Sequence, residues 1–218
     1  MKLAIFDIDG TLVDSRRVIL DAMMQAFDRC DLGDPGFDRI RKVVGLGLRE
    51  AFCALEPDAP DELISQLQAA YIEAFQIMRE TPERREHLYD GALGLLENLH
   101  RWGWKLGVAT GKSRRGVAHI LRLHGLERLF HVSVCADDGP GKPNPFMVEE
   151  NLRLIGACRQ NTLVIGDATH DMGMALAAGV RAVGVAWGFA TAEELALAGA
   201  HEVHHDYPSL SRSLAWLR

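Results

Sequence analysis

The sequence lacks the features that mark secreted, membrane-spanning and nucleic-acid-binding proteins. Its four cysteines stand far apart without a CxxC pair, which indicates free thiols in a reducing compartment rather than a disulfide framework or a zinc site. No apolar run approaches the roughly 20 residues that a membrane-spanning helix needs, and the first run meets acidic residues too early for a signal peptide. The net charge of −6 gives no basic field for nucleic acid or anionic lipid. We therefore expect a cytoplasmic protein without nucleic-acid or membrane partners.

Internal repeats and low-complexity linkers are also missing from the chain. Its 218 residues, of which 48% are hydrophobic and a quarter charged, have the composition of an ordinary globular protein. This length allows one large domain or a domain with a sizeable insert.

Short, almost entirely apolar runs alternate with segments of helical periodicity over much of the chain. Runs of this kind are typical of strands buried on both faces of a parallel sheet, with helices between them. The predicted strands cover residues 3–6, 105–110, 132–136, 162–165 and 181–185. We therefore predict an α/β protein with a Rossmann-like parallel sheet that is covered by helices on both faces.

The stretch between the first and second predicted strands has a different pattern. Its apolar residues follow helical spacing, glycines and prolines interrupt it, and no convincing strand is found there. We predict that residues 15–84 form a small all-helical cap domain inserted after the first strand. Residues 1–14 and 85–218 would then form the α/β core domain.

Two carboxylates follow directly on the first predicted strand, at Asp7 and Asp9. A carboxylate at the end of a buried strand is costly unless it is paired or binds a cation. The ordinary explanation is a strand that runs into an Asp-Gly turn. The alternative is a site for a hard cation such as Mg²⁺, which prefers oxygen ligands and keeps waters that a phosphate can replace.

The later strands also end in polar residues. Thr110 and Gly111 follow the second strand, Lys142 lies in the loop after the third, and Asp167 and Asp171 follow the fourth. Each has an ordinary explanation as a helix start, a solvated loop lysine or a helix-capping pair. Ligands in such folds bind beyond the carboxyl ends of the strands, and four consecutive strand ends of this kind together favour one functional rim.

With these residues at its strand ends, the chain resembles the haloacid-dehalogenase-like superfamily of phosphatases. The resemblance covers essentially the whole chain, in the order and spacing of the family's four motifs. The matching segments are Asp7-Ile-Asp9-Gly10-Thr11, Thr110-Gly111, Lys142-Pro143 and Gly166-Asp167-Ala-Thr-His-Asp171. The insert also matches, in size and position, the helical cap that members of this family carry after the first strand.

The resemblance implies a reaction through an aspartyl-phosphate on Asp7, the nucleophile. Asp9 would protonate the leaving oxygen and then activate water. Mg²⁺ would be held by Asp7, the backbone carbonyl of Asp9 and Asp167, while Gly10 and Thr11 would support this motif.

The remaining motif residues are expected to bind the phosphoryl group. Lys142 would add positive charge beside the nucleophile, and Thr110 with the Gly111 N–H would hold phosphoryl oxygens. Asp171 would orient Lys142 or a metal-bound water. Arg49, after the turn Gly45-Leu-Gly47 in the predicted cap, is a candidate for a distal anionic group of the substrate, with a solvated helix arginine as the alternative.

The wider sequence around the third and fourth motifs resembles the phosphoglycolate-phosphatase-like branch of the family. We therefore expect a small phosphorylated metabolite as substrate, 2-phosphoglycolate first, and a monomer or homodimer. The alternatives are a pyrophosphatase or a phosphosugar phosphatase or mutase on the same scaffold, and a non-enzymatic phospho-binding protein. A phosphonate-cleaving relative would need a lysine in the cap, where Lys42 is the only one.

Overall fold

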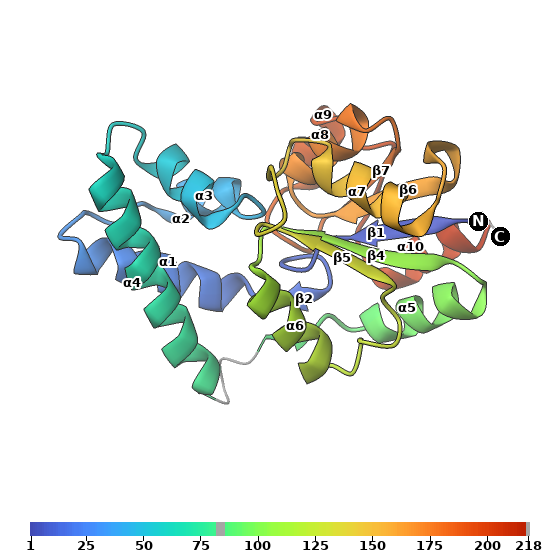
Figure 1. Cartoon of the computed structure of the whole chain (residues 1–218), viewed down its shortest axis with the longest axis horizontal. Coiled ribbons are helices and arrows are strands. Elements are labelled where there is room, and N and C mark those ends of the chain that lie inside the picture. Colours follow the sequence, from blue (N-terminus) through green and yellow to red (C-terminus); the bar gives the residue numbers. More distant parts are fainter. Residues whose placement is uncertain (82–85, 217–218) are drawn as a thin grey trace.

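The computed structural model describes residues 1–81 and 86–216. Within them a six-stranded parallel sheet has the strand order β5-β4-β1-β6-β7-β8 (Figure 1). Its strands are β1 (Leu3–Phe6), β4 (Lys105–Thr110), β5 (Val132–Cys135), β6 (Thr162–Gly166), β7 (Arg181–Val185) and β8 (Glu202–His204). Ile5 of β1 lies opposite Gly107 on one side and Val164 on the other. The carboxyl end of β1 is therefore flanked by those of β4 and β6.

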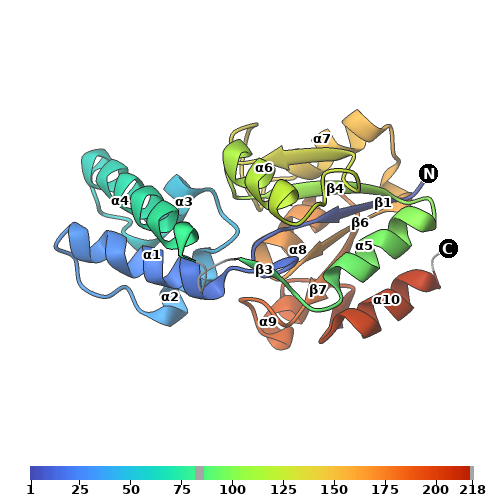
Figure 2. The same ribbon diagram turned by 90° about the horizontal axis from the view of Figure 1, so that it is seen from below.

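Helices cover both faces of this sheet, as the sequence predicted (Figures 1 and 2). One layer contains α5 (Ala92–Arg101), α6 (Arg114–Leu123) and α10 (Tyr207–Ala215), and the other contains α7 (Phe146–Ile155), α8 (Thr169–Ala177) and α9 (Ala192–Leu197). Alternate residues of β1 pack against the two layers: Phe6 lies in the apolar cluster with α5, α6 and α10, and Ile5 lies in the cluster with α7, α8 and α9. The predicted Rossmann-like fold class is confirmed.

The segment after the first strand is helical in the described residues. It contains α1 (Arg16–Arg29), α2 (Phe37–Val43), α3 (Leu48–Leu55) and α4 (Asp61–Glu80). These helices share an apolar cluster of their own, in which Phe27, Phe52 and Leu67 are buried. We call α1–α4 the helical cap. The domain limits at residues 14 and 85 stay a prediction, and residue 85 lies outside the described residues.

A small antiparallel ribbon joins the helical cap to the sheet. β2 (Val13–Asp14) pairs with β3 (His87–Leu88), with Val13 opposite Leu88. The chain therefore leaves and re-enters the core through two segments that are hydrogen-bonded to each other. The sequence analysis did not predict this ribbon, because two-residue strands show no periodicity.

The C-terminal part contains elements that the sequence analysis missed. The edge strand β8 and the helices α9 and α10 follow the last predicted strand. β8 was missed because two of its three residues are polar; Glu202 accepts a hydrogen bond from Ser213 and pairs with His204. A short 3₁₀ turn also precedes β6, at Arg159–Asn161. None of the helices in the described ranges has the length and apolarity to cross a membrane.

Candidate active site

The candidate site is built around Asp7, the residue that follows β1. Its carboxylate is buried, and its Oδ1 lies 2.7 Å from Nζ of Lys142, which enters from the loop after β5. The same Nζ lies 2.6 Å from Oδ1 of Asp171 in the first turn of α8. One buried lysine thus bridges two carboxylates from different strand ends, and the orienting role expected of Asp171 stays a prediction.

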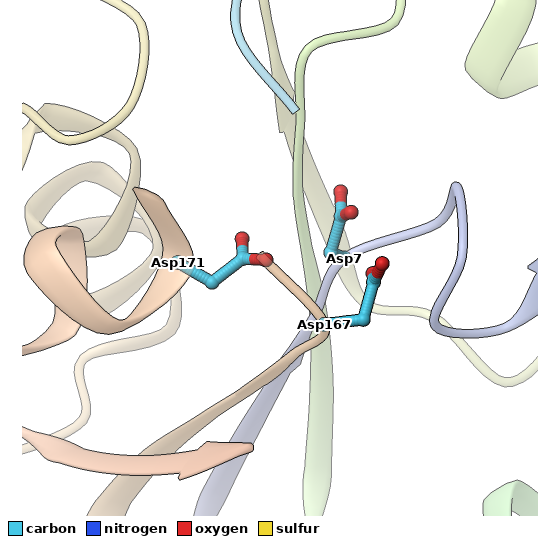
Figure 3. Close-up of side chains that lie close together, drawn as sticks. All are labelled: Asp7, Asp167 and Asp171. Carbon is cyan, nitrogen blue, oxygen red and sulfur yellow. The ribbon is translucent and has the colours of Figure 1, made fainter. Parts of the chain in front are cut away.

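Three carboxylates converge here, from Asp7, Asp167 and Asp171 (Figure 3). Each offers an oxygen, and these oxygens lie within 4.8 Å of one another. Burial raises the pKa of Asp7 to about 7, with Lys142 opposing and Asp171 adding to the rise. Burial and the charge of Asp7 raise the pKa of Asp167 well above its ordinary value. Three buried carboxylates with one lysine among them fit a divalent cation that prefers oxygen ligands.

Asp167 is held on both oxygens by groups that the sequence places far from it. Thr11 Oγ1 donates to its Oδ1 at 2.7 Å, and the Phe189 N–H donates to its Oδ2 at 2.9 Å. Gly10 has a φ of 81°, and a Cβ there would overlap the Asp167 carboxylate. Gly10 and Thr11, which were expected to support the first motif, therefore both lie in close contact with Asp167.

Thr110 and Gly111 lie at the end of β4, on the opposite side of β1 from Asp167. Thr110 is buried, and its hydroxyl accepts a hydrogen bond from the Lys112 N–H. At Gly111 a Cβ would overlap the backbone oxygens of Gly45 and Leu46 in the cap. Glycine at 111 therefore lets the loop between α2 and α3 approach the rim of the sheet closely.

The side chain of Asp9 belongs to a different ionic group from Asp7. Its Oδ1 lies 2.8 Å from Nζ of Lys112, and this Nζ lies 2.9 Å from Oε1 of Glu86. Glu86 Oε2 in turn accepts a hydrogen bond from Arg79 Nε at 2.6 Å. The sequence analysis did not single out Lys112, Glu86 or Arg79. Only the position of Lys112 next to Thr110-Gly111 could have drawn attention to it.

A cavity of about 640 Å³ lies between the rim of the sheet and the helical cap. Asp7, Asp9 and Thr110 line it from the core. Arg49 lines it from α3, as expected, but its Nη2 pairs at 2.6 Å with Oδ1 of Asp61, and its side chain is 44% exposed. The structure thus places Arg49 at the cavity with an acidic partner of its own.

Comparison with known proteins identifies the family. The model of the haloacid dehalogenase-like hydrolases matches residues 4–185. This chain belongs to that family. The resemblance of the four motifs to haloacid-dehalogenase-like proteins is thereby confirmed, and the matched range includes Asp7, Lys142, Asp167 and Asp171 of the candidate site.

Two relatives and one solved structure illustrate the similarity of this hydrolase to known proteins. It is 31% identical over 196 residues to pyrophosphatase PpaX of Bacillus pumilus, covering 89% of this chain and 88% of that one. It is 35% identical over 201 residues to a Dickeya dadantii protein named "Probable phosphatase IndB", covering 88% and 84%. A Pseudomonas syringae hydrolase superposes with a TM-score of 0.90 at 28% identity, over 100% and 99% of the chains.

Proposed function

We propose that this hydrolase is a magnesium-dependent phosphatase that cleaves a small phosphomonoester through an aspartyl-phosphate on Asp7. The observation that carries the proposal is the Asp7 carboxylate itself. It is buried, touches the ammonium of Lys142 at 2.7 Å, and lines a cavity together with Asp9 and Thr110. A carboxylate beside a fixed cation can meet a phosphate dianion, because the cation offsets the repulsion between the two anions.

The first step transfers the phosphoryl group to Asp7. An oxygen of Asp7 forms the new bond to phosphorus, the bond to the leaving oxygen breaks, and Asp9 gives that oxygen a proton. In the second step Asp9 takes a proton from water, the water oxygen attacks phosphorus, and Asp7 is released with inorganic phosphate. Thr110 and the Gly111 N–H hold the phosphoryl oxygens in both steps.

The residues that would hold Mg²⁺ are Asp7 and Asp167, together with the backbone carbonyl of Asp9. The fit rests on the buried carboxylates of Asp7, Asp167 and Asp171, whose oxygens gather within 4.8 Å, and on the single lysine that touches two of them. When bound, Mg²⁺ would neutralise charge on the phosphoryl oxygens. Asp171 is engaged by Lys142 and keeps this lysine beside the nucleophile.

For the substrate we propose 2-phosphoglycolate first, because the sequence around the third and fourth motifs resembles the phosphoglycolate-phosphatase-like branch. Pyrophosphate is the second candidate, since the relative at 31% identity is named a pyrophosphatase. The four free cysteines support a cytoplasmic location for an enzyme acting on such a metabolite.

The test is phosphate release from a panel of phosphorylated metabolites and pyrophosphate, with magnesium and with EDTA. We expect turnover that needs the metal and is abolished by Asp7→Asn. Asp58→Asn serves as the matched control, because Asp58 is an exposed aspartate in the loop between α3 and α4. Near-native turnover by Asp7→Asn would refute the proposed intermediate. Metal-dependent turnover of a different compound would refute only the substrate.

A further inference from the structure

The residue proposed as acid and base, Asp9, is restrained by a lysine that the four motifs do not include. Nζ of Lys112 lies 2.8 Å from Asp9 Oδ1, and the side chain of Lys112 is only 9% exposed. The ammonium of Lys112 is therefore almost enclosed and in direct contact with the Asp9 carboxylate.

Lys112 is itself fixed from two other sides. Its Nζ lies 2.9 Å from Glu86 Oε1 and 5.3 Å from the centre of the Phe75 ring. Glu86 is fully buried and also accepts a hydrogen bond from Arg79 Nε. Arg79 and Phe75 belong to α4, whereas Glu86 directly precedes β3. The ammonium of Lys112 thus sits where the core, the ribbon and the last helix of the cap meet.

We infer that Lys112 is a positioning residue for the proposed phosphatase reaction. It fixes Oδ1 of Asp9, so that the other carboxylate oxygen faces the leaving oxygen and later the attacking water. Through Glu86 and Arg79 this arrangement depends on where α4 lies. The inference rests on the proposed function, since it assigns to Lys112 a part in the proton transfers made by Asp9.

The two chemical steps depend on Asp9 to different degrees, and this gives the inference a specific signature. A nitrophenolate leaving group departs without a proton, so transfer to Asp7 from 4-nitrophenyl phosphate needs little help from Asp9. The hydrolysis that follows still needs a base for the water. Loss of positioning should therefore slow the second step much more than the first. With phenyl phosphate, whose leaving group is more basic, both steps should become slow.

The experiment is a stopped-flow measurement of nitrophenolate release by Lys112→Met with saturating magnesium and 4-nitrophenyl phosphate. We expect a burst close to one nitrophenolate per site at about the wild-type first-turnover rate. The steady rate that follows should fall at least about ten-fold. Lys112→Arg should recover most of the steady rate, because it keeps a cation beside Asp9. Lys105→Met is the matched control, since Lys105 lies at the opposite end of β4.

Glu86→Gln is a second variant that tests the positioning role of Lys112. It leaves Lys112 in place but weakens its anchor, so we expect the same burst with a smaller loss of the steady rate. If circular dichroism shows that Lys112→Met does not fold, the result with Glu86→Gln decides the question alone.

Three outcomes would overturn the positioning role of Lys112 and leave the phosphatase standing. They are equal losses in burst and steady rate, no change in either, and a raised KM with an unchanged kcat, which would make Lys112 a substrate-binding residue. Absence of metal-dependent turnover in the wild-type protein on every phosphomonoester would instead overturn the proposed function, and the role of Lys112 with it.

Discussion

Replacement of Asp7 by asparagine should make the metal-free protein more stable while it removes activity. Asp7 is buried, and its pKa is raised from an ordinary 3.8 to about 7, chiefly by that burial. Between these two pH values the unfolded chain has lost a proton that the native protein still holds. The free energy of unfolding therefore falls as the pH rises through this range. Asparagine cannot ionise, so the variant lacks this loss.

The size of the effect follows from the span between the two pKa values. Each pH unit is worth about 1.4 kcal/mol, so the carboxylate of Asp7 destabilises the metal-free protein by at most about 4 kcal/mol above pH 7. The contribution vanishes only well below pH 4, where Asp7 is protonated both in the native protein and in the unfolded chain. Binding of Mg²⁺ to the ionised carboxylate should reverse the order of stability in favour of the wild type.

The assay is urea unfolding of both proteins in EDTA at pH 5 and pH 8, repeated at pH 8 with magnesium. We expect the advantage of Asp7→Asn to grow between pH 5 and pH 8 and to disappear with the metal. Asp58→Asn should show neither effect. An Asp7→Asn protein that is no more stable than wild type at pH 8 in EDTA would refute the claim that the ionised, buried carboxylate of Asp7 destabilises the metal-free protein.

Three further substitutions test the surroundings of the site and the helical cap. Gly10→Ala should lower magnesium affinity at least about ten-fold by calorimetric titration, because its Cβ would displace Asp167; an unchanged affinity would contradict this. Tyr207→Phe removes a 2.6 Å hydrogen bond to the Thr11 carbonyl and should cost about 1 kcal/mol in urea unfolding. Phe52→Ala should cost about 3–5 kcal/mol in the same assay, because Phe52 is completely buried in the cap cluster; a loss below about 1 kcal/mol would show that this cluster contributes little.

The strands that carry Asp7, Thr110 and Asp167 could be predicted because strands buried on both faces are apolar along their whole length. The polar residues that end them then stand out, and a parallel sheet brings those ends to one edge. The edge strand β8 lacks this signal because a strand at the edge of the sheet can carry polar side chains. Here Glu202 and His204 pair with each other.

The network around Asp9 could not be predicted for a different reason. Lys112 lies 26 residues from Glu86 in the chain and still farther from Asp9, and no local pattern marks contacts between residues so far apart. The ion pair made by Arg49 could not be predicted from the sequence either. The place of Arg49 at the cavity agrees with the expectation, but the partner that engages it, Asp61, is known only from the structure.

The two carboxylates of the first motif each have their own lysine, and the two lysines are anchored differently. Lys142, beside Asp7, has its second carboxylate contact with Asp171, which lies in α8 on the sheet. Lys112, beside Asp9, is tied through Glu86 to the cap helix α4. A displacement of α4 relative to the sheet would therefore disturb Asp9 and leave the surroundings of Asp7 intact. We therefore expect the position of the helical cap to affect the proton transfers proposed for Asp9 rather than the nucleophilic attack proposed for Asp7.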